Sequence, residues 1–144
     1  MSAVADWPTY LTREALWEKD HLAQSLGIEI IDAAPGRAVA RLHARDTMTN
    51  GTGVVHGAIA YALADTVFGF AANLGQTMTL THSAEIRYHS PVQVGEVLEA
   101  VCTERWREGR RGVYDAAVRV GDRLVAEYVG HATVVRPPGS GDSP

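Results

Sequence analysis

The sequence has little cysteine. Cys102 is the single cysteine among 144 residues, so no internal disulfide bond can form. Such a chain suits a reducing compartment, and we expect a cytoplasmic protein. The two preceding residues, Ala100 and Val101, are apolar. Cys102 is therefore predicted to be a small core residue of a strand rather than a reactive thiol.

Long apolar runs and an excess of positive charge are also missing. No run approaches the roughly 20 apolar residues that span a bilayer. The N-terminus lacks the basic start and apolar block of a secretory signal. The net charge is −4, which argues against a nucleic-acid-binding surface. We therefore expect neither a membrane nor a nucleic acid as a partner.

The motifs of several enzyme classes are absent. The six histidines show no metal-ligating spacing such as HxH, HxxxH or HExxH, so we expect no metal site. The glycine pair Gly51 and Gly53 lacks the third glycine of a dinucleotide-binding loop. Neither Ser83 nor Ser90 has the flanking glycines of a nucleophile elbow. We expect no cofactor.

The sequence patterns that are present indicate one domain. Residues 1–27 are predicted to form an N-terminal arm and a helix over residues 12–26, with Thr12 as its N-cap and Gly27 as its end. Residues 28–135 form the main domain. Residues 136–144 are rich in Pro, Gly and Ser and are predicted to be a disordered tail.

Within the main domain, a single long helix stands among strands. A helix is predicted over residues 55–74, closed by Gly75. A turn-rich loop precedes it at residues 46–53. Strands are predicted over residues 28–33, 37–44, 78–89, 97–106, 113–120 and 124–135. The fold class is therefore α+β, with a curved, mostly antiparallel sheet wrapped around the helix. A hotdog fold is one of several arrangements that fit this order.

Asp65 is the only charged side chain between His56 and Asn73. A helix that is apolar on nearly every side does not carry an unpaired carboxylate without cost. Asp65 therefore either has a partner elsewhere in the fold or performs chemistry. It lies opposite the apolar stripe of the helix, on a second face of small residues that allows close approach. The stripe is Ile59, Leu63, Val67, Phe70 and Leu74; the second face is Ala58, Tyr61, Ala62, Phe68, Gly69 and Ala72.

The glycine-rich junction before this helix is a candidate oxyanion site. It runs from Asn50 to Gly57, and glycine lets the backbone approach a ligand closely. The first N–H groups of a helix are unpaired and lie at its positive end, where they can polarise a carbonyl group. The alternative is that these glycines only shape a tight turn.

The spacing of Gly57 and Asp65 has a geometric consequence. Eight residues of helix separate them by about 12 Å. A reacting carbonyl must lie within about 3 Å of both the oxyanion donor and the nucleophile or base. If both residues are catalytic, they act from two antiparallel copies of the helix, which predicts a dimer.

Two other features leave alternatives open. His56 is expected to position the loop or Asn50 rather than to act as a base. The basic cluster Arg105, Arg107, Arg110 and Arg111 is either a solvated turn or a contact for the phosphates of an anionic ligand.

Two motifs resemble a known family. Asn50, His56, Gly57 and Asp65 form N-x5-HG-x7-D, and the helix continues as LAD-x7-N to Asn73. A later segment, residues 84–96, ends in a Pro-x3-Gly-acid turn. Together they resemble the hotdog acyl-CoA thioesterases of the phenylacetate-degradation (PaaI) type, over roughly residues 20–135.

This resemblance implies hydrolysis of an acyl-CoA thioester without a metal, at a site between the subunits of a dimer that often pairs into a homotetramer. It implies that Asp65 is the nucleophile or general base and Gly57 the backbone oxyanion donor. It further implies that Asn50 orients the carbonyl or the water, with His56 in support. Two departures stand out: Ala58 replaces a frequent glycine, and Gly69 replaces a hydroxyl found in some relatives.

We therefore expect an acyl-CoA thioesterase for an aromatic or medium-sized acyl group. Tyr61, Thr66 and Phe68 are the predicted contacts of the acyl group, and Arg107 and Arg110 those of CoA. One alternative is a hotdog hydratase or dehydratase of acyl-CoA, which pairs an acid with a catalytic histidine. Another is a non-catalytic acyl-CoA-binding module in which Asp65 is paired with an arginine.

Overall fold

The computed structural model describes residues 11–135, so the predicted tail and most of the N-terminal arm lie outside the described residues. Six antiparallel strands form one sheet in the order β1-β2-β4-β5-β6-β3. The strands are β1 (Glu29–Ala34), β2 (Arg37–His43), β3 (Thr79–Tyr88), β4 (Val97–Glu108), β5 (Arg111–Val120) and β6 (Arg123–Val134). The predicted α+β arrangement is confirmed.

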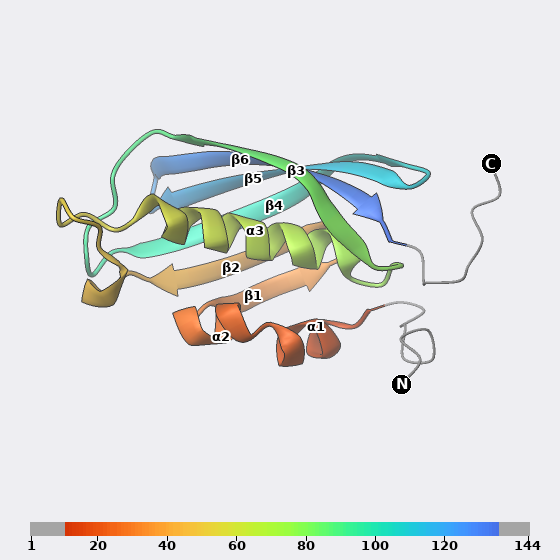
Figure 1. The fold of residues 1–144 in the computed structure, drawn as a ribbon, viewed down its shortest axis with the longest axis horizontal. Coiled ribbons are helices and arrows are strands. Elements are labelled where there is room, and N and C mark those ends of the chain that lie inside the picture. The colour runs from red at the N-terminus through yellow and green to blue at the C-terminus, as the bar shows by residue number, and fades with distance from the viewer. Residues whose placement is uncertain (1–10, 136–144) are drawn as a thin grey trace.

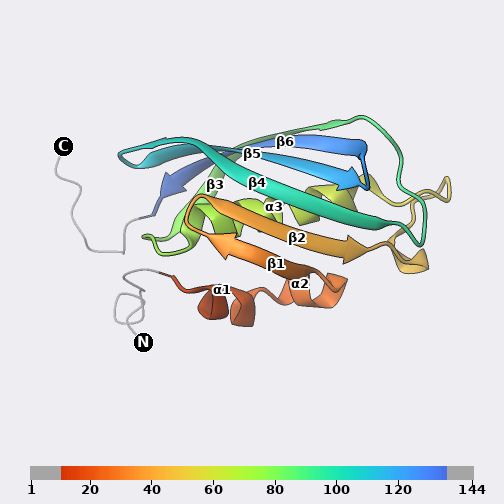
Figure 2. The ribbon, with the colours of Figure 1, turned by 180° about the vertical axis from the view of Figure 1, so that it is seen from behind.

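The central helix, α3 (Gly57–Asn73), lies across one face of the sheet (Figures 1 and 2). It buries Leu63, Val67 and Phe70 of the predicted apolar stripe. Phe68 and Ala72 were predicted to share the open face with Asp65, and this is wrong because both are at most 2% exposed. The curved sheet covers a wider arc of α3 than a single stripe. Within residues 11–135, no helix is both long and apolar enough to cross a bilayer.

The ends of α3 have clear local causes. The helix begins at Gly57, two residues later than predicted, because His56 is its N-cap. The His56 Nδ1 accepts a hydrogen bond from the Ala58 N–H at 3.1 Å. At the other end, Leu74 leaves the helical conformation, and Gly75 follows with a φ of 66°, as its predicted closing position requires.

The N-terminal segment departs from the prediction of one helix over residues 12–26. It forms two short helices, α1 (Arg13–Lys19) and α2 (His21–Leu26). Asp20 breaks the helix with a φ of −87° and a ψ of 73°, and its side chain accepts from the Ala23 N–H. The two predicted ends are confirmed: Thr12 caps α1, and Gly27 ends α2 in the left-handed region.

The β4–β5 hairpin is longer than predicted. Residues 107–112 were predicted to be the turn, but the two strands pair as far as Glu108 and Arg111. Arg107 therefore belongs to a strand, opposite Gly112. Cys102 on β4 is fully buried, as predicted. Burial and the nearby Asp115 carboxylate raise the pKa of its thiol to about 12.

Candidate functional site

The two predicted catalytic residues of α3, Gly57 and Asp65, line different pockets. The first, here called the loop pocket, encloses about 330 Å³ at the start of α3. The second, here called the Asp65 pocket, encloses about 230 Å³ farther along the helix. The loop pocket is lined by Asn50, Val54, Val55, His56, Gly57, Ala60, Tyr88, His89, Ser90, Pro91, Val92, Leu98 and Val125. The Asp65 pocket is lined by Leu16, Asp20, Leu22, Ala62, Asp65, Thr66, Gly69, Phe70 and Asn73.

The backbone N–H of Gly57 is available to a ligand. The next two N–H groups of the helix are satisfied by the N-cap: Ala58 donates to the His56 ring, and Ile59 donates to the His56 carbonyl at 2.9 Å. The Gly57 N–H has no acceptor among residues 11–135. It lies at the positive end of a 17-residue helix, where a donor can stabilise an oxyanion.

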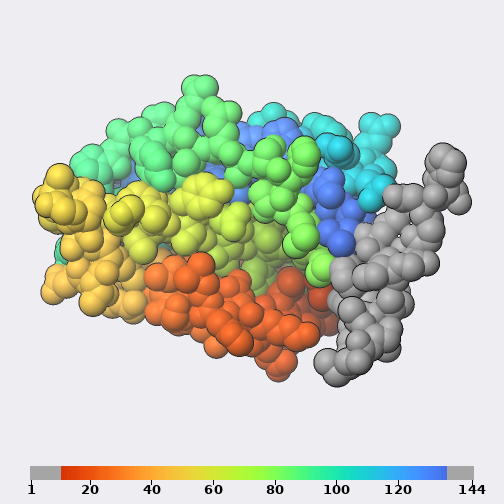
Figure 3. All heavy atoms as spheres, in the orientation of Figure 1, coloured from red at the N-terminus to blue at the C-terminus, as the bar shows by residue number. Residues whose placement is uncertain are grey.

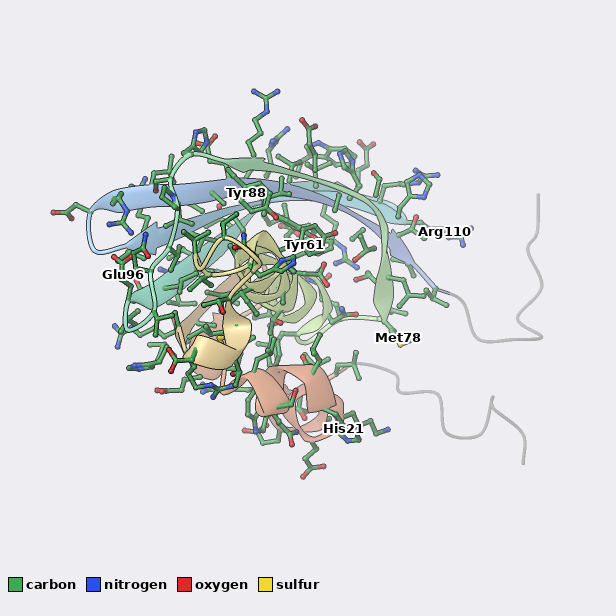
Figure 4. The ribbon with its side chains drawn as sticks, turned by 60° about the vertical axis from the view of Figure 1, so that its left-hand side comes forward. His21, Tyr61, Met78, Tyr88, Glu96 and Arg110 are labelled. Carbon is green, nitrogen blue, oxygen red and sulfur yellow. The ribbon has the colours of Figure 1, made fainter. Side chains whose placement is uncertain are left out.

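Tyr88, at the end of β3, holds this glycine in place. Its hydroxyl donates to the Gly57 carbonyl at 2.9 Å, and a Cβ at position 57 would lie 3.2 Å from the tyrosine ring. Figure 4 shows Tyr88 on the same side of the molecule as Tyr61. Burial and Tyr61 raise the pKa of Tyr88, so its hydroxyl remains a donor at neutral pH. Sequence reasoning assigned Tyr88 no role, because its contact with Gly57 spans 31 residues.

Asn50 stabilises the loop with one end of its amide and leaves the other end open. Its Oδ1 accepts from the backbone N–H of Thr52 at 2.9 Å and from the Thr52 hydroxyl at 2.7 Å. These two donors fix the orientation of the amide, so Nδ2 is the remaining group. Nδ2 has no acceptor within the part of the chain that the structure describes. It can donate to a carbonyl oxygen or to a water in the loop pocket.

His56 also lines the loop pocket and is exposed. Because Nδ1 accepts a hydrogen bond, the proton of the neutral ring lies on Nε2. The ring therefore supports the start of α3, and its part in catalysis stays a prediction. Among residues 11–135, no three His, Cys, Asp or Glu side chains gather to hold a metal ion.

Asp65 is half-buried and has a partner that the sequence did not reveal. Its Oδ1 accepts a hydrogen bond of 2.7 Å from the hydroxyl of Tyr128 on β6. Within the described residues, the carboxylate forms no ion pair and no second hydrogen bond. Its Oδ2 is therefore free to act on a ligand in the Asp65 pocket.

The predicted acyl contacts are distributed differently. Thr66 lines the Asp65 pocket, and its hydroxyl donates to the Ala62 carbonyl at 2.7 Å. Tyr61 and Phe68 line neither pocket. Tyr61 packs edge-on against the ring of Tyr128, and Phe68 lies between the rings of Tyr114 and Tyr128. Substrate binding by these three residues stays a prediction.

The wall of the Asp65 pocket that sequence reasoning missed comes from the N-terminal helices. Leu16 of α1 and Leu22 of α2 face the pocket across from α3, together with Asp20. Leu22 is 62% exposed. The sequence predicted a helix over residues 12–26 but not which part of the fold it covers.

Arg107 and Arg110 lie at the end of α3 far from Gly57. Arg107 donates to the Ala72 carbonyl at 3.1 Å and to the Tyr114 hydroxyl at 3.3 Å. Arg110 is exposed at the tip of the β4–β5 hairpin, well away from Tyr61 (Figure 4). Contact between these arginines and CoA stays a prediction.

Comparisons with known proteins identify the family of this chain. The sequence model of the thioesterase superfamily matches residues 52–127, which contain the start of α3 and Asp65. The chain is 33% identical to the acyl-coenzyme A thioesterase PaaI of Escherichia coli (strain K12) over 104 residues, 72% of this chain and 74% of that protein.

Solved structures give the same result. The E. coli PaaI protein from the phenylacetic acid degradation operon matches with a TM-score of 0.83 and 30% identity, over 86% of this chain and 91% of that one. A mutant of the phenylacetic acid degradation protein PaaI from Thermus thermophilus matches with a TM-score of 0.77 and 30% identity, over 81% of this chain and 100% of that one. The predicted resemblance and the hotdog fold are both confirmed. The chain therefore belongs to the thioesterase superfamily and is a thioester hydrolase.

Proposed function

We propose that this enzyme hydrolyses acyl-CoA thioesters to a free carboxylate and CoA in the cytoplasm, at sites shared between two chains. One observation carries the proposal. The same helix, α3, presents a carboxylate oxygen of Asp65 and a backbone N–H of Gly57 that both lack a hydrogen-bond partner among residues 11–135. The two groups have the chemistry of a nucleophile or base and of an oxyanion donor. The E. coli relative of this chain, PaaI, is an acyl-coenzyme A thioesterase.

The separation of the two groups supports a dimer. They lie about 12 Å apart along α3, too far to contact one carbonyl group. They also line different pockets of the same chain. An antiparallel partner helix brings Gly57 of one chain beside Asp65 of the other. Each dimer then contains two equivalent sites.

Two surfaces suit this assembly. Among residues 11–135, Ala58 on α3 is exposed, and Ala62 and Gly69 are half-buried. The surface of α3 is visible between β3 and the N-terminal helices in Figure 3. Among the strands of residues 11–135, β3 is an edge strand that pairs with β6 alone, and its Leu80 is 56% exposed. An uncovered edge of this kind readily pairs with another chain. The outer face of the sheet remains for a second contact, so we expect a homotetramer of two dimers.

The reaction follows from the placement of these groups. The thioester carbonyl oxygen accepts a hydrogen bond from the Gly57 N–H, which stabilises the negative charge of the tetrahedral intermediate. Asp65 Oδ2 either attacks the carbonyl carbon itself or removes a proton from an attacking water. The C–S bond then breaks, and the CoA thiolate leaves and takes up a proton. Asn50 Nδ2 orients the carbonyl or the water, and His56 supports the loop.

The two routes differ in one intermediate. Direct attack gives an anhydride of the acyl group and Asp65, which water then hydrolyses. A single turnover in ¹⁸O-labelled water places the label in an Asp65 peptide only if water attacks the aspartyl carbon of that anhydride. Label in Asp65, detected by mass spectrometry, would therefore establish the nucleophilic route.

The walls of the Asp65 pocket support a compact acyl group. Leu16, Leu22 and Phe70 supply apolar surface, and Gly69 leaves room beside the carboxylate. A cavity of about 230 Å³ accommodates an aromatic or medium-sized acyl group. Thr66 lies in this wall. Tyr61 and Phe68 contact the ring of Tyr128, whose hydroxyl bonds to Asp65. We assign the CoA phosphates to Arg107 and Arg110.

The test is thiol release from a panel of acyl-CoAs by the wild-type protein and by Asp65→Asn. We expect kcat to fall by about 100-fold or more in the variant, because the nucleophile or base is lost. Equal rates in the two proteins would refute the mechanism. Hydration of crotonyl-CoA tests the hydratase alternative. The non-catalytic alternative required an arginine paired with Asp65, and residues 11–135 contain no such pair.

A further inference from the structure

The hydroxyl of Tyr128 is buried and directed at Asp65. Tyr128 lies on β6, with Ala116 of β5 on one side and Ile86 of β3 on the other. It is 1% exposed, and its hydroxyl donates to Asp65 Oδ1 at 2.7 Å. A tyrosine held within a sheet between two neighbouring strands has little freedom to move. The donor is therefore fixed relative to α3.

Packing alone does not account for this hydroxyl. The ring of Tyr128 contacts the rings of Tyr61 and Phe68, with centroids 5.6 and 5.8 Å away. A phenylalanine would make the same ring contacts. A buried hydroxyl is costly unless it forms a hydrogen bond, and this one bonds to Asp65. The hydroxyl group, which phenylalanine lacks, is thus directed at the Asp65 carboxylate.

The hydroxyl is a permanent donor. Burial and the neighbouring Asp65 carboxylate raise the pKa of Tyr128 above its usual value. The group therefore stays protonated at neutral pH. Gly69, one turn beyond Asp65, has no side chain to offer a second donor. Among residues 11–135, Tyr128 supplies the only hydrogen bond to the Asp65 carboxylate.

We propose that Tyr128 is a positioning residue: by holding Oδ1, it fixes the plane of the Asp65 carboxylate and leaves Oδ2 as the oxygen that acts on the thioester. This inference rests on the proposed function. The terminal torsion of an aspartate is broad, so an unheld carboxylate samples many orientations. Misplacement of a reacting atom lowers the rate of the chemical step more than it weakens binding.

The test is Tyr128→Phe, with Tyr114→Phe as a matched control. Tyr114 is also fully buried, and its ring lies 5.4 Å from that of Phe68. Its hydroxyl bonds to Glu104 and Arg107, and not to Asp65. Both substitutions delete one buried hydroxyl, so a merely structural loss affects both. We expect Tyr128→Phe to lower kcat by roughly 10- to 100-fold with KM changed less than about 3-fold. Tyr114→Phe should retain kcat within about 2-fold. Because the Tyr114 hydroxyl accepts from Arg107, a proposed CoA contact, only kcat and not KM serves as the control.

A double-mutant cycle separates positioning from structure. If Tyr128 acts through Asp65, Tyr128→Phe has no further effect on the residual rate of Asp65→Asn. Urea unfolding confirms that each variant is folded. Two results would overturn the inference. One is an equal loss of kcat in Tyr128→Phe and Tyr114→Phe. The other is that Tyr128→Phe lowers the rate by the same factor in the wild-type protein and in Asp65→Asn. Full activity of Asp65→Asn would instead refute the proposed function, and this inference with it.

Discussion

Replacement of Gly57 by proline removes one N–H without breaking the helix. Gly57 is the first residue of α3, a position that proline favours because its N–H has no partner within the helix. The preceding residue, His56, has a ψ of 135°, which is compatible with a following proline. Gly57 itself is not among the glycines with positive φ. The cap that His56 provides to Ala58 should survive the substitution.

The expected loss follows from the role of the missing donor. Deletion of one oxyanion donor costs about 100- to 1,000-fold in kcat, or about 2.7–4 kcal/mol of transition-state stabilisation. A side chain at position 57 also crowds Tyr88, since a Cβ there would lie 3.2 Å from its ring. Gly57→Ala introduces the same Cβ but keeps the N–H. The ratio of kcat between the alanine and proline variants therefore cancels the effect of the Cβ and reports on the lost N–H together with the ring carbons that replace it.

The assay is steady-state thiol release with a good acyl-CoA substrate, with urea unfolding as a check on stability. We expect the proline variant to be at least about 100-fold slower than the alanine variant. Equal kcat values in two folded variants would refute the assignment of Gly57 as the oxyanion donor.

The same variant tests whether the site is shared. Gly57→Pro and Asp65→Asn are each expected to be inactive alone. A hybrid dimer of the two contains one intact site, formed by the Gly57 of one chain and the Asp65 of the other. Random exchange makes half of the dimers hybrid, so the mixture should recover about a quarter of wild-type activity. No recovery in a mixture shown to contain hybrids would contradict a site between chains.

Three further predictions concern stability and reactivity. Gly130→Ala should lower the free energy of unfolding in urea by about 1–3 kcal/mol, because its Cβ would meet the buried ring of Phe68 at 3.0 Å; Gly69→Ala, with open space at its Cβ, should not. Asp20→Ala should cost about 1 kcal/mol by the same measurement, since it removes the N-cap of α2. Cys102 should not react with Ellman's reagent at pH 8 in the folded protein, because its thiol, with a pKa of about 12, is protonated and buried; it should react after unfolding in urea.

The order of the strands along the chain and the single central helix could be predicted from the sequence because their signals are local. Apolar periodicity marked α3, and turn residues marked most strand ends. The division of the N-terminal helix at Asp20 could not be predicted with the same ease. Asp20 is compatible with a helix interior, and only its bond to Ala23 shows that it caps a new helix.

The site shows the same contrast. Asn50, His56, Gly57 and Asp65 could be found because they lie in one short segment with recognisable spacing. Tyr88 and Tyr128 could not, since their contacts with Gly57 and Asp65 span 31 and 63 residues. Such pairs depend on the register of β3 and β6 against α3, which no local pattern specifies.

Gly57 and Asp65 lie in separate pockets of one chain. This separation predicts how the activity changes when the protein is diluted. Under the proposed mechanism, a lone chain holds a carboxylate and an N–H that are too far apart to cooperate, so it should be inert however well it is folded. Specific activity should therefore fall as the total enzyme concentration drops below the dissociation constant of the dimer. At the lowest concentrations, the rate should grow with the square of the amount of protein rather than in proportion to it.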